Sequence, residues 1–262
     1  LTVKIIDALE GRVVDGPLAG SAVFVDLDAD AVHDANEPSG VTNSQGFFSI
    51  NQPSNKAKLI AKGGTDTTTG VALPEFVLMA DLPEDESAPV SITPITTLLA
   101  HIPSDELKAG FLSKIGIKGS YQTFLETDYW AKAQAGDLEA IHAQRINQII
   151  GLLMQTASSL QIYKVDSSLS FIVESLSEQD DINLANANTV LTLLKIAASD
   201  ASISLPDSKL IAVANSVATI NAAFTNPDLN PTDSTATAIA AVAQQILQIN
   251  IKKLAENEIT VD

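Results

Sequence analysis

The sequence predicts an α+β protein in two parts: an N-terminal antiparallel β-sandwich over residues 1–92 and a C-terminal all-α helical bundle over residues 93–262. Three observations support this fold class. Short β-type runs separated by turn residues recur at roughly 8–12-residue spacing in the first part. Apolar residues recur at helical spacings in the second part. Hydrophobic residues make up 45% of the chain, which is enough to build a packed core.

The first part contains short runs that are typical of strands. Turn residues such as Asp15-Gly16-Pro17 separate them, because Gly and Pro favour turns over strands. Many short strands at this spacing are typical of a small antiparallel sandwich. The predicted strands are Val3–Ile6, Gly11–Val14, Ser21–Leu27, Gly46–Ile50, Lys56–Ala61, Glu75–Met79 and Val90–Ile92.

The second part is predicted to be helical throughout. Asp137 is expected to cap a long helix that reaches Leu160, since an Asp side chain can accept from the free N–H groups of a first turn. Pro206 and Pro231 stand where proline is tolerated best, in a first helical turn. The other predicted helices are Thr93–Ala100, Ser104–Ile115, Ser120–Thr127, Asp128–Ala135, Ser167–Leu176, Asn188–Ala198, Pro206–Phe224 and Pro231–Glu256.

Charge and composition exclude several functions. The chain has 32 acidic and 15 basic residues, a formal charge of −17, and no cysteine. Disulfides and thiolate sites are therefore excluded. Nucleic acid is not an expected partner, because its phosphates are neutralised by Lys and Arg. No apolar run approaches the ~18 residues of a membrane span, so membrane insertion is not expected either.

An acidic loop carries the strongest chemical signal. Its oxygen-bearing side chains stand at positions 1, 3, 5, 9 and 12, and position 7 offers a backbone carbonyl. This is the ligand spacing of a 12-residue calcium loop, in which alternate residues of a tight loop converge on one ion. Calcium takes six to eight oxygen ligands, so the loop fits it better than magnesium. The predicted Ca²⁺ ligands are Asp26, Asp28, Asp30, Val32, Asp34 and Glu37.

Two features separate this loop from a standard EF-hand. Position 6, which is normally Gly for a sharp turn, is Ala31, whose left-handed conformation costs ~1–2 kcal/mol. A β-like run, Ala22–Val25, leads into the loop in place of a helix. We therefore predict an EF-hand-like metal-binding loop in a β domain. The alternative is a solvated acidic turn that holds no ion.

The residues around this loop resemble a known group of modules. Val23–Asp30, Glu37-Pro38 and Val41–Ile50 resemble the calcium-bearing β-sandwich modules of bacterial surface proteins, the SdrD B-like and carboxypeptidase-regulatory-like modules. Ala61–Gly70, Ile92–Leu98 and Leu125–Trp130 resemble segments that follow such modules in large bacterial adhesins. The resemblance implies a cell-adhesion role outside the cell, on the bacterial surface or secreted. It implies neighbouring modules of the same chain, and a surface glycan or protein ligand, as partners.

Two further candidate sites have simpler alternatives. Asp66 follows two glycines and precedes three threonines, so it is a candidate ligand of a second metal ion. The alternative is a turn whose Asp and Thr side chains satisfy backbone donors. Tyr121, Tyr129 and Trp130 are a candidate ligand-binding group, because aromatic rings with polar tips can bind sugars or protein partners. The alternative is packing in the core.

No catalytic motif accompanies these sites. The sequence has no nucleophile elbow, phosphate loop or dinucleotide fingerprint, and its three histidines are scattered. We predict a noncatalytic, extracellular, calcium-stabilised structural or adhesion module of a large bacterial surface protein. Two alternatives stay open. One is a ligand-binding module that holds a glycan, peptide or apolar ligand in a groove of the helical part. The other is a secreted hydrolase with a structural calcium.

Overall fold

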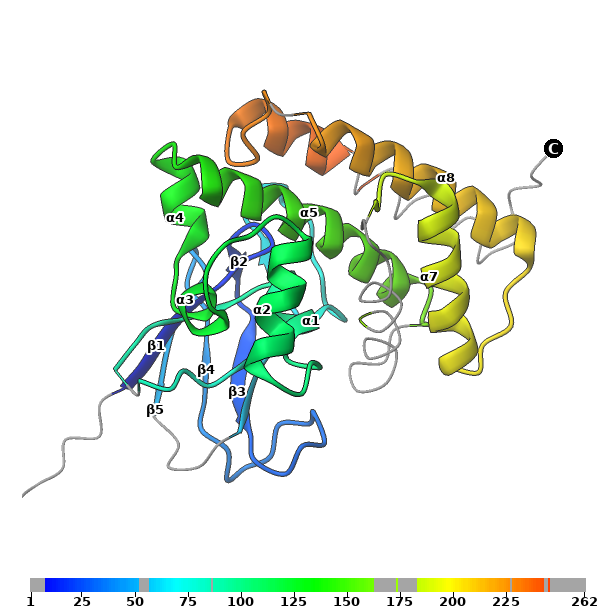
Figure 1. The fold of residues 1–262 in the computed structure, drawn as a ribbon. Helices are drawn as coiled ribbons and strands as arrows, with labels where there is room; N and C mark the ends of the chain where they lie inside the picture. Colours follow the sequence, from blue (N-terminus) through cyan, green and yellow to red (C-terminus); the bar gives the residue numbers. More distant parts are fainter. Residues whose placement is uncertain are drawn as a thin grey trace, which may run out of the picture.

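The computed structural model describes residues 8–51, 57–85, 87–162, 173, 183–226, 228–242 and 245. Within them the chain is α+β, with the strands first in sequence and the helices after them (Figure 1). The predicted strand Val3–Ile6, and the predicted helix Ser167–Leu176 apart from Val173, lie outside these residues. Among the described helices, none is long and apolar enough to cross a membrane.

The strands form three small sheets. One has the order β5-β1-β9, one has the order β4-β3-β6-β8, and β2 pairs with β7. All neighbouring strands are antiparallel except β1 and β9, which run parallel. The bounds are β1 Ala8–Val13, β2 Leu18–Ala19, β3 Ala22–Asp26, β4 Ser39–Val41, β5 Phe47–Asn51, β6 Lys58–Lys62, β7 Thr65–Asp66, β8 Val77–Asp81 and β9 Val90–Ile92.

The expectation of purely antiparallel strands is wrong for one pair. Between β1 and β9 the chain passes through β6 and β8 of the other sheet. It then returns to the first sheet, where β9 runs parallel to β1. The short strands β2, β4 and β7 were not predicted, because two or three residues are too few to show an alternating pattern. β5 does alternate, with Phe48 and Ile50 buried between exposed neighbours. At Gly11, opposite Phe48, a Cβ atom would come within 2.6 Å of that ring.

Most described helices begin within two residues of their predicted starts, after a polar N-cap. Ser104, Ser120, Asp128, Asp137 and Asn186 each accept a first-turn N–H. The N-cap role of Asp137 is thus confirmed. The prediction that Pro206 and Pro231 stand in a first helical turn is wrong: Pro206 is itself an N-cap, and Pro231 lies in a turn ahead of a helical segment at 234–242. The bounds are α1 Pro94–Leu99, α2 Asp105–Lys114, α3 Tyr121–Leu125, α4 Tyr129–Gln134, α5 Leu138–Ser159, α7 Ala187–Asp200 and α8 Asp207–Phe224.

The strands and the helices share one continuous core. The switch between them falls between Ile92 and Pro94, near the predicted boundary at residue 93. One cluster of buried apolar residues runs from β1, β3, β6 and β8 into α1, α4, α5 and α8. Helix α1 closes the free edge of β8. Thr97 Oγ1 accepts from the N–H of Met79 at 2.9 Å, and Thr96 Oγ1 donates to the Met79 carbonyl at 3.0 Å.

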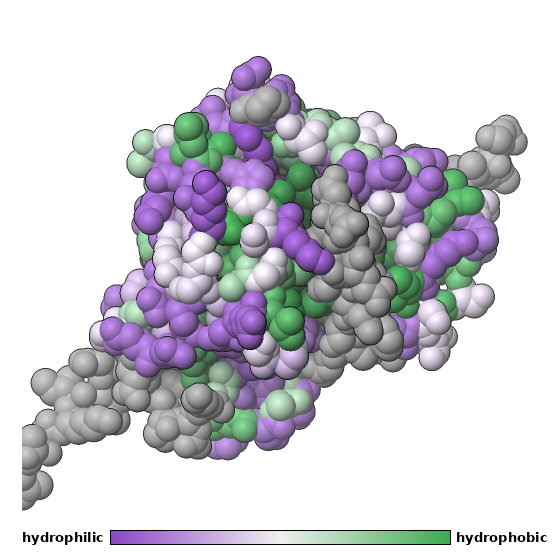
Figure 2. Space-filling view, in the orientation of Figure 1, coloured by the Kyte–Doolittle hydropathy of each residue, from purple (hydrophilic) through white to green (hydrophobic). Residues whose placement is uncertain are grey.

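The visible surface carries many hydrophilic residues (Figure 2). In Figure 2 purple residues are frequent over the strands and over α2–α4, with white and green residues between them. The net charge of −17 agrees with such a surface. The apolar side chains are instead concentrated in the shared core, which fixes the strands and α5 that carry the sites described below.

Candidate functional site

The acidic loop connects β3 to β4 and leaves the sheet at Asp26 (Figure 1). Asp26, the last residue of β3, is only 6% exposed, and Glu37 at the other end of the loop is also 6% exposed. Asp28, Asp30 and Asp34 lie on the exposed part between them. The buried ends therefore fix the loop, and its middle carboxylates are open to solvent.

Three of the predicted ligands converge. One carboxylate oxygen from each of Asp26, Asp28 and Asp30 lies within 4.8 Å of the other two. Oxygens on opposite sides of a calcium ion, at ~2.4 Å each, are at most ~4.8 Å apart, so the spacing of these three meets the upper limit for ligands of one ion. Asp34 and Glu37 lie outside this group of three. The side chain of Val32 is exposed, as expected if this residue contributes only its carbonyl.

The loop backbone folds around the carboxylate of Asp26. Asp26 Oδ1 accepts from the N–H of Ala29 at 2.8 Å and of Asp30 at 3.3 Å, and Oδ2 accepts from Ala31 at 3.1 Å. Ala29 and Ala31 have φ of 64° and 57°, in the left-handed region that favours glycine. The sharp turn expected at position 6 is therefore present, although an alanine makes it.

Glu37 closes the loop from its far end. Its Oε1 accepts from the N–H of Leu27 at 2.7 Å, and its Oε2 accepts from the N–H of Asp34 at 2.9 Å. The carboxylate thus joins positions 2 and 9 of the loop to position 12. This bracing keeps the two ends together, which a loop must do if its alternate residues are to surround one ion.

The electrostatics of the loop favour a bound cation. Burial raises the pKa of Asp26, the N–H groups of Ala31, Ala29 and Asp30 oppose this rise, and the charge of Glu37 adds to it. The exposed carboxylates of Asp28 and Asp30 add further negative charge at the same point. A divalent cation would neutralise this charge and offset the cost of burying Asp26.

Asp66, the candidate ligand of a second metal ion, is hydrogen-bonded to its own turn. Its Oδ1 accepts from the backbone N–H of Thr68 at 2.8 Å and from Thr68 Oγ1 at 2.7 Å. Its Oδ2 accepts from Thr69 Oγ1 at 2.8 Å. This is the turn arrangement in which Asp and Thr side chains satisfy local donors, and we propose no metal at Asp66.

A second buried carboxylate lies beside Asp66. Asp15, in the turn between β1 and β2, is 5% exposed and accepts a hydrogen bond from Gln155 of α5. Burial, followed by the charge of Asp66, raises the pKa of Asp15 to about 8, and the Gln155 hydrogen bond opposes the rise. Sequence reasoning missed this cluster, because 140 residues separate Asp15 from Gln155. One signal was available: Gly151 stands inside an apolar helix, where glycine needs a packing reason.

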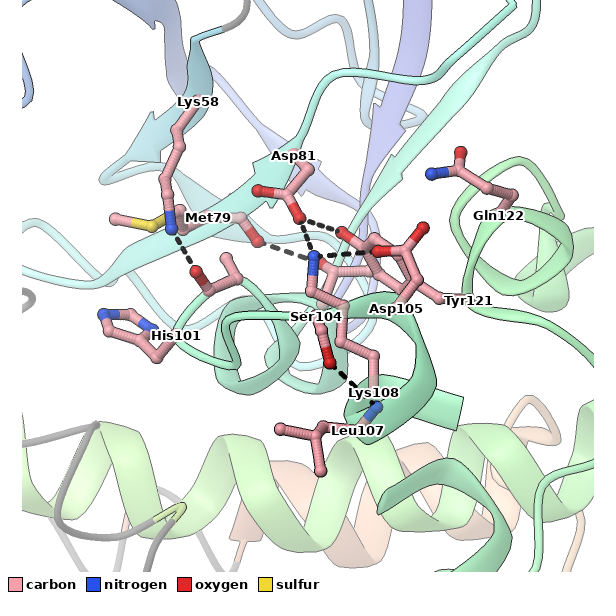
Figure 3. Close-up of polar contacts among 12 residues, drawn as sticks. Lys58, Met79, Asp81, His101, Ser104, Asp105, Leu107, Lys108, Tyr121 and Gln122 are labelled. Atoms are coloured by element: carbon pink, nitrogen blue, oxygen red, sulfur yellow. Dashed lines mark hydrogen bonds and ion pairs between the residues drawn. The ribbon is translucent and has the colours of Figure 1, made fainter. Parts of the chain in front are cut away.

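The candidate aromatic group is packed inside the protein. Tyr121, Tyr129 and Trp130 are 1%, 9% and 3% exposed, so they present no open face to a ligand. Tyr121 belongs to a polar network that ties α2 and α3 to the end of β8 (Figure 3). Its hydroxyl donates to Asp81 at 2.9 Å, and Lys108 bonds the same oxygen at 2.5 Å while lying 4.1 Å from the Tyr121 ring centroid. These contacts serve to hold the helices on the sheet.

The histidines are spread over the described structure. His33 lies exposed in the acidic loop, with its ring 5.2 Å from that of Phe24. His101 Nδ1 is 2.8 Å from the Thr97 carbonyl, and His142 Nε2 is 2.9 Å from the Ile115 carbonyl. Each of the last two is thus engaged with a backbone carbonyl of a neighbouring turn.

An apolar groove lies in the helical part. It runs between α8 and the 234–242 helix and has a volume of about 940 Å³. Ile239 and Val242 are 40% and 56% exposed there. The lining residues are Asn215, Ser216, Thr219, Ile220, Ser234, Thr235, Ala238, Ile239 and Val242. The groove can accept an apolar surface, and its described lining residues include no acidic or basic side chain.

Comparisons with protein-family models, curated proteins and solved structures gave no match for this chain. The resemblance to calcium-bearing surface modules therefore stays a prediction.

Proposed function

We propose that the protein is a noncatalytic, extracellular, calcium-stabilised structural or adhesion module of a large bacterial surface protein. The observation that carries the proposal is the convergence of Asp26, Asp28 and Asp30 within 4.8 Å in a loop braced by Glu37. In this proposal the β5-β1-β9 and β4-β3-β6-β8 sheets are the two layers of a sandwich, and the helices that follow form a bundle docked on it.

The mechanism is one of linkage between binding and folding. Calcium would neutralise the loop, order its exposed middle and hold the ends of β3 and β4 together. An ion that binds only the folded chain stabilises it by RT ln(1 + [Ca²⁺]/Kd), about 2.7 kcal/mol at 100 times Kd. For a chain of this size each kcal/mol raises Tm by roughly 2–4 °C, so saturation should raise Tm by roughly 5–10 °C.

Thermal unfolding with and without chelator tests the proposal. Calcium should raise the Tm of the wild type, and the combined variant Asp28→Ala, Glu37→Ala should lose this response. Glu37→Ala also removes the acceptor of two backbone N–H groups, so Asp28→Asn is the cleaner single change. Glu10→Gln, at an exposed residue of β1, is the matched control and should keep the full response. A calcium-loaded wild type whose melting curve is unmoved by chelator would refute the proposal.

A second candidate function is supported by the apolar groove between α8 and the 234–242 helix. Its volume of about 940 Å³ and its exposed Ile239 and Val242 suit an apolar ligand or the apolar face of a peptide. Titration with an environment-sensitive apolar dye tests this function. The wild type should bind the dye, and Val242→Asp, Ile239→Asp should bind it less with an unchanged Tm. The hydrolase alternative gains no support, because the buried Asp15–Asp66 pair borders a cavity of only about 10 Å³.

A further inference from the structure

Helix α5 approaches the β1–β2 turn unusually closely at Asp15. The Asp15 side chain accepts from Gln155, and it lies over Gly151 one turn earlier on the same helix. A Cβ atom at residue 151 would overlap the carboxylate, with only 2.8 Å to Asp15 Cγ. The contact therefore exists only because residue 151 has no side chain. It joins the sheet part to the longest described helix.

The carboxylate at this contact has no counter-charge among the described residues. The titratable group that faces it is Asp66, whose own oxygens accept three hydrogen bonds from Thr68 and Thr69. The other residues around the small cavity come from α5, α8 and the 234–242 helix, and none of them is titratable: Gln148, Leu152, Ile220, Phe224 and Ala240. Two adjacent buried carboxyl groups cannot both be ionised without a large cost.

We propose that Asp15 is a proton-dependent clamp between the β-sheet part and helix α5. Protonated, its side chain is neutral and can stay buried against Gly151 and Gln155. Ionised, it adds a second buried charge next to Asp66, so the contact loosens and water enters the turn. The clamp would make docking of the helices on the sheets weaken as pH rises. This inference is independent of calcium binding, because Asp15 lies outside the acidic loop.

The sign of the effect follows from the two states. In the unfolded chain Asp15 ionises at its ordinary value of 3.8, whereas in the folded chain burial and Asp66 raise its pKa to about 8. Between these values the folded state holds a proton that the unfolded state has lost. The free energy of unfolding therefore falls as pH rises through this window, and it levels off above the folded-state pKa.

Denaturant unfolding of the full chain between pH 5 and 9 tests the clamp. Over the window, the folding equilibrium constant of the wild type should fall by up to about tenfold per pH unit relative to Asp15→Asn, which mimics the neutral acid. Glu10→Gln, on the exposed side of β1, should keep the wild-type slope. Chelator should be present throughout, so that the acidic loop contributes equally to all three proteins. Parallel curves for the wild type and Asp15→Asn would overturn the proposal.

A measurement on the wild type alone covers the case in which Asp15→Asn does not fold. The carboxyl carbon of Asp15 can be followed by NMR across the same pH range, with hydrogen exchange measured along α5. The carboxyl should titrate far above pH 4, and exchange at 148–156 should increase relative to α2 as it ionises. A titration midpoint near 4, or exchange along α5 that does not depend on pH after correction for intrinsic rates, would overturn the clamp.

Discussion

Ala31→Gly tests the geometry of the acidic loop at one of its two left-handed alanines. Ala31 has φ of 57°, and its N–H donates to Asp26 at 3.1 Å, so the left-handed backbone is held by the first predicted ligand. The residue is partly exposed, and glycine removes only a methyl group. The substitution therefore changes the backbone preference of the loop and leaves its oxygens in place.

The magnitude follows from two opposing terms. A left-handed alanine costs ~1–2 kcal/mol, and glycine removes this cost. Glycine also makes the unfolded chain more flexible, which lowers the free energy of unfolding by about 0.4–1 kcal/mol. The net expectation is a gain of about 0.5–1 kcal/mol in the free energy of unfolding. For a chain of this size that gain corresponds to an increase in Tm of roughly 1–4 °C.

Denaturant and thermal unfolding without calcium measure the effect, and Ala35→Gly is the matched control. Ala35 lies exposed in the same loop but outside the left-handed region, so its replacement should lose about 0.5–1 kcal/mol. The two variants should thus shift Tm in opposite directions. If Ala31→Gly destabilises the protein as much as Ala35→Gly does, residue 31 is not left-handed and the proposed loop geometry is wrong.

Two further changes test how the helices are held. Gly151→Ala should destabilise by about 1–3 kcal/mol, since its methyl group would overlap a carboxylate of the β1–β2 turn, whereas Gly110→Ala, which meets no atom within 4 Å, should be neutral or stabilising. Lys108→Met should cost about 1–3 kcal/mol, because it leaves the partly buried Asp81 carboxylate without its cation. Lys195→Met removes an exposed ion pair and should change stability by less than about 1 kcal/mol. Equal effects within either pair would contradict the packing described.

Local signals in the sequence predicted much of the fold. The polar cap Asp137 located the start of the longest described helix, because a cap depends only on neighbouring residues. The strands that carry alternating or continuous apolar runs were also found, as β3 and β5 show. The parallel pairing of β1 with β9 was not found, because it depends on the path of the chain between the sheets and not on any local pattern.

In the candidate sites, too, local contacts could be predicted from the sequence and long-range contacts could not. The convergence of Asp26, Asp28 and Asp30 could be predicted, since a tight loop brings alternate residues together. The Asp15–Gln155 contact could not, because it depends on how α5 docks against a turn far away in the sequence. Composition likewise marked Tyr121 as a candidate for ligand binding, but tertiary packing decided its burial against Asp81 and Lys108.

Calorimetric titration of the calcium-free protein with Ca²⁺ tests the central claim most directly. The claim is that the loop from Asp26 to Glu37 holds a calcium ion that stabilises the fold. The wild type should bind at the loop, Asp28→Asn should bind more weakly, and the combined variant Asp28→Ala, Glu37→Ala should lose this binding while Glu10→Gln keeps it. A folded wild type that takes up no calcium at millimolar concentration, or binding that survives the combined variant unchanged, would contradict the claim.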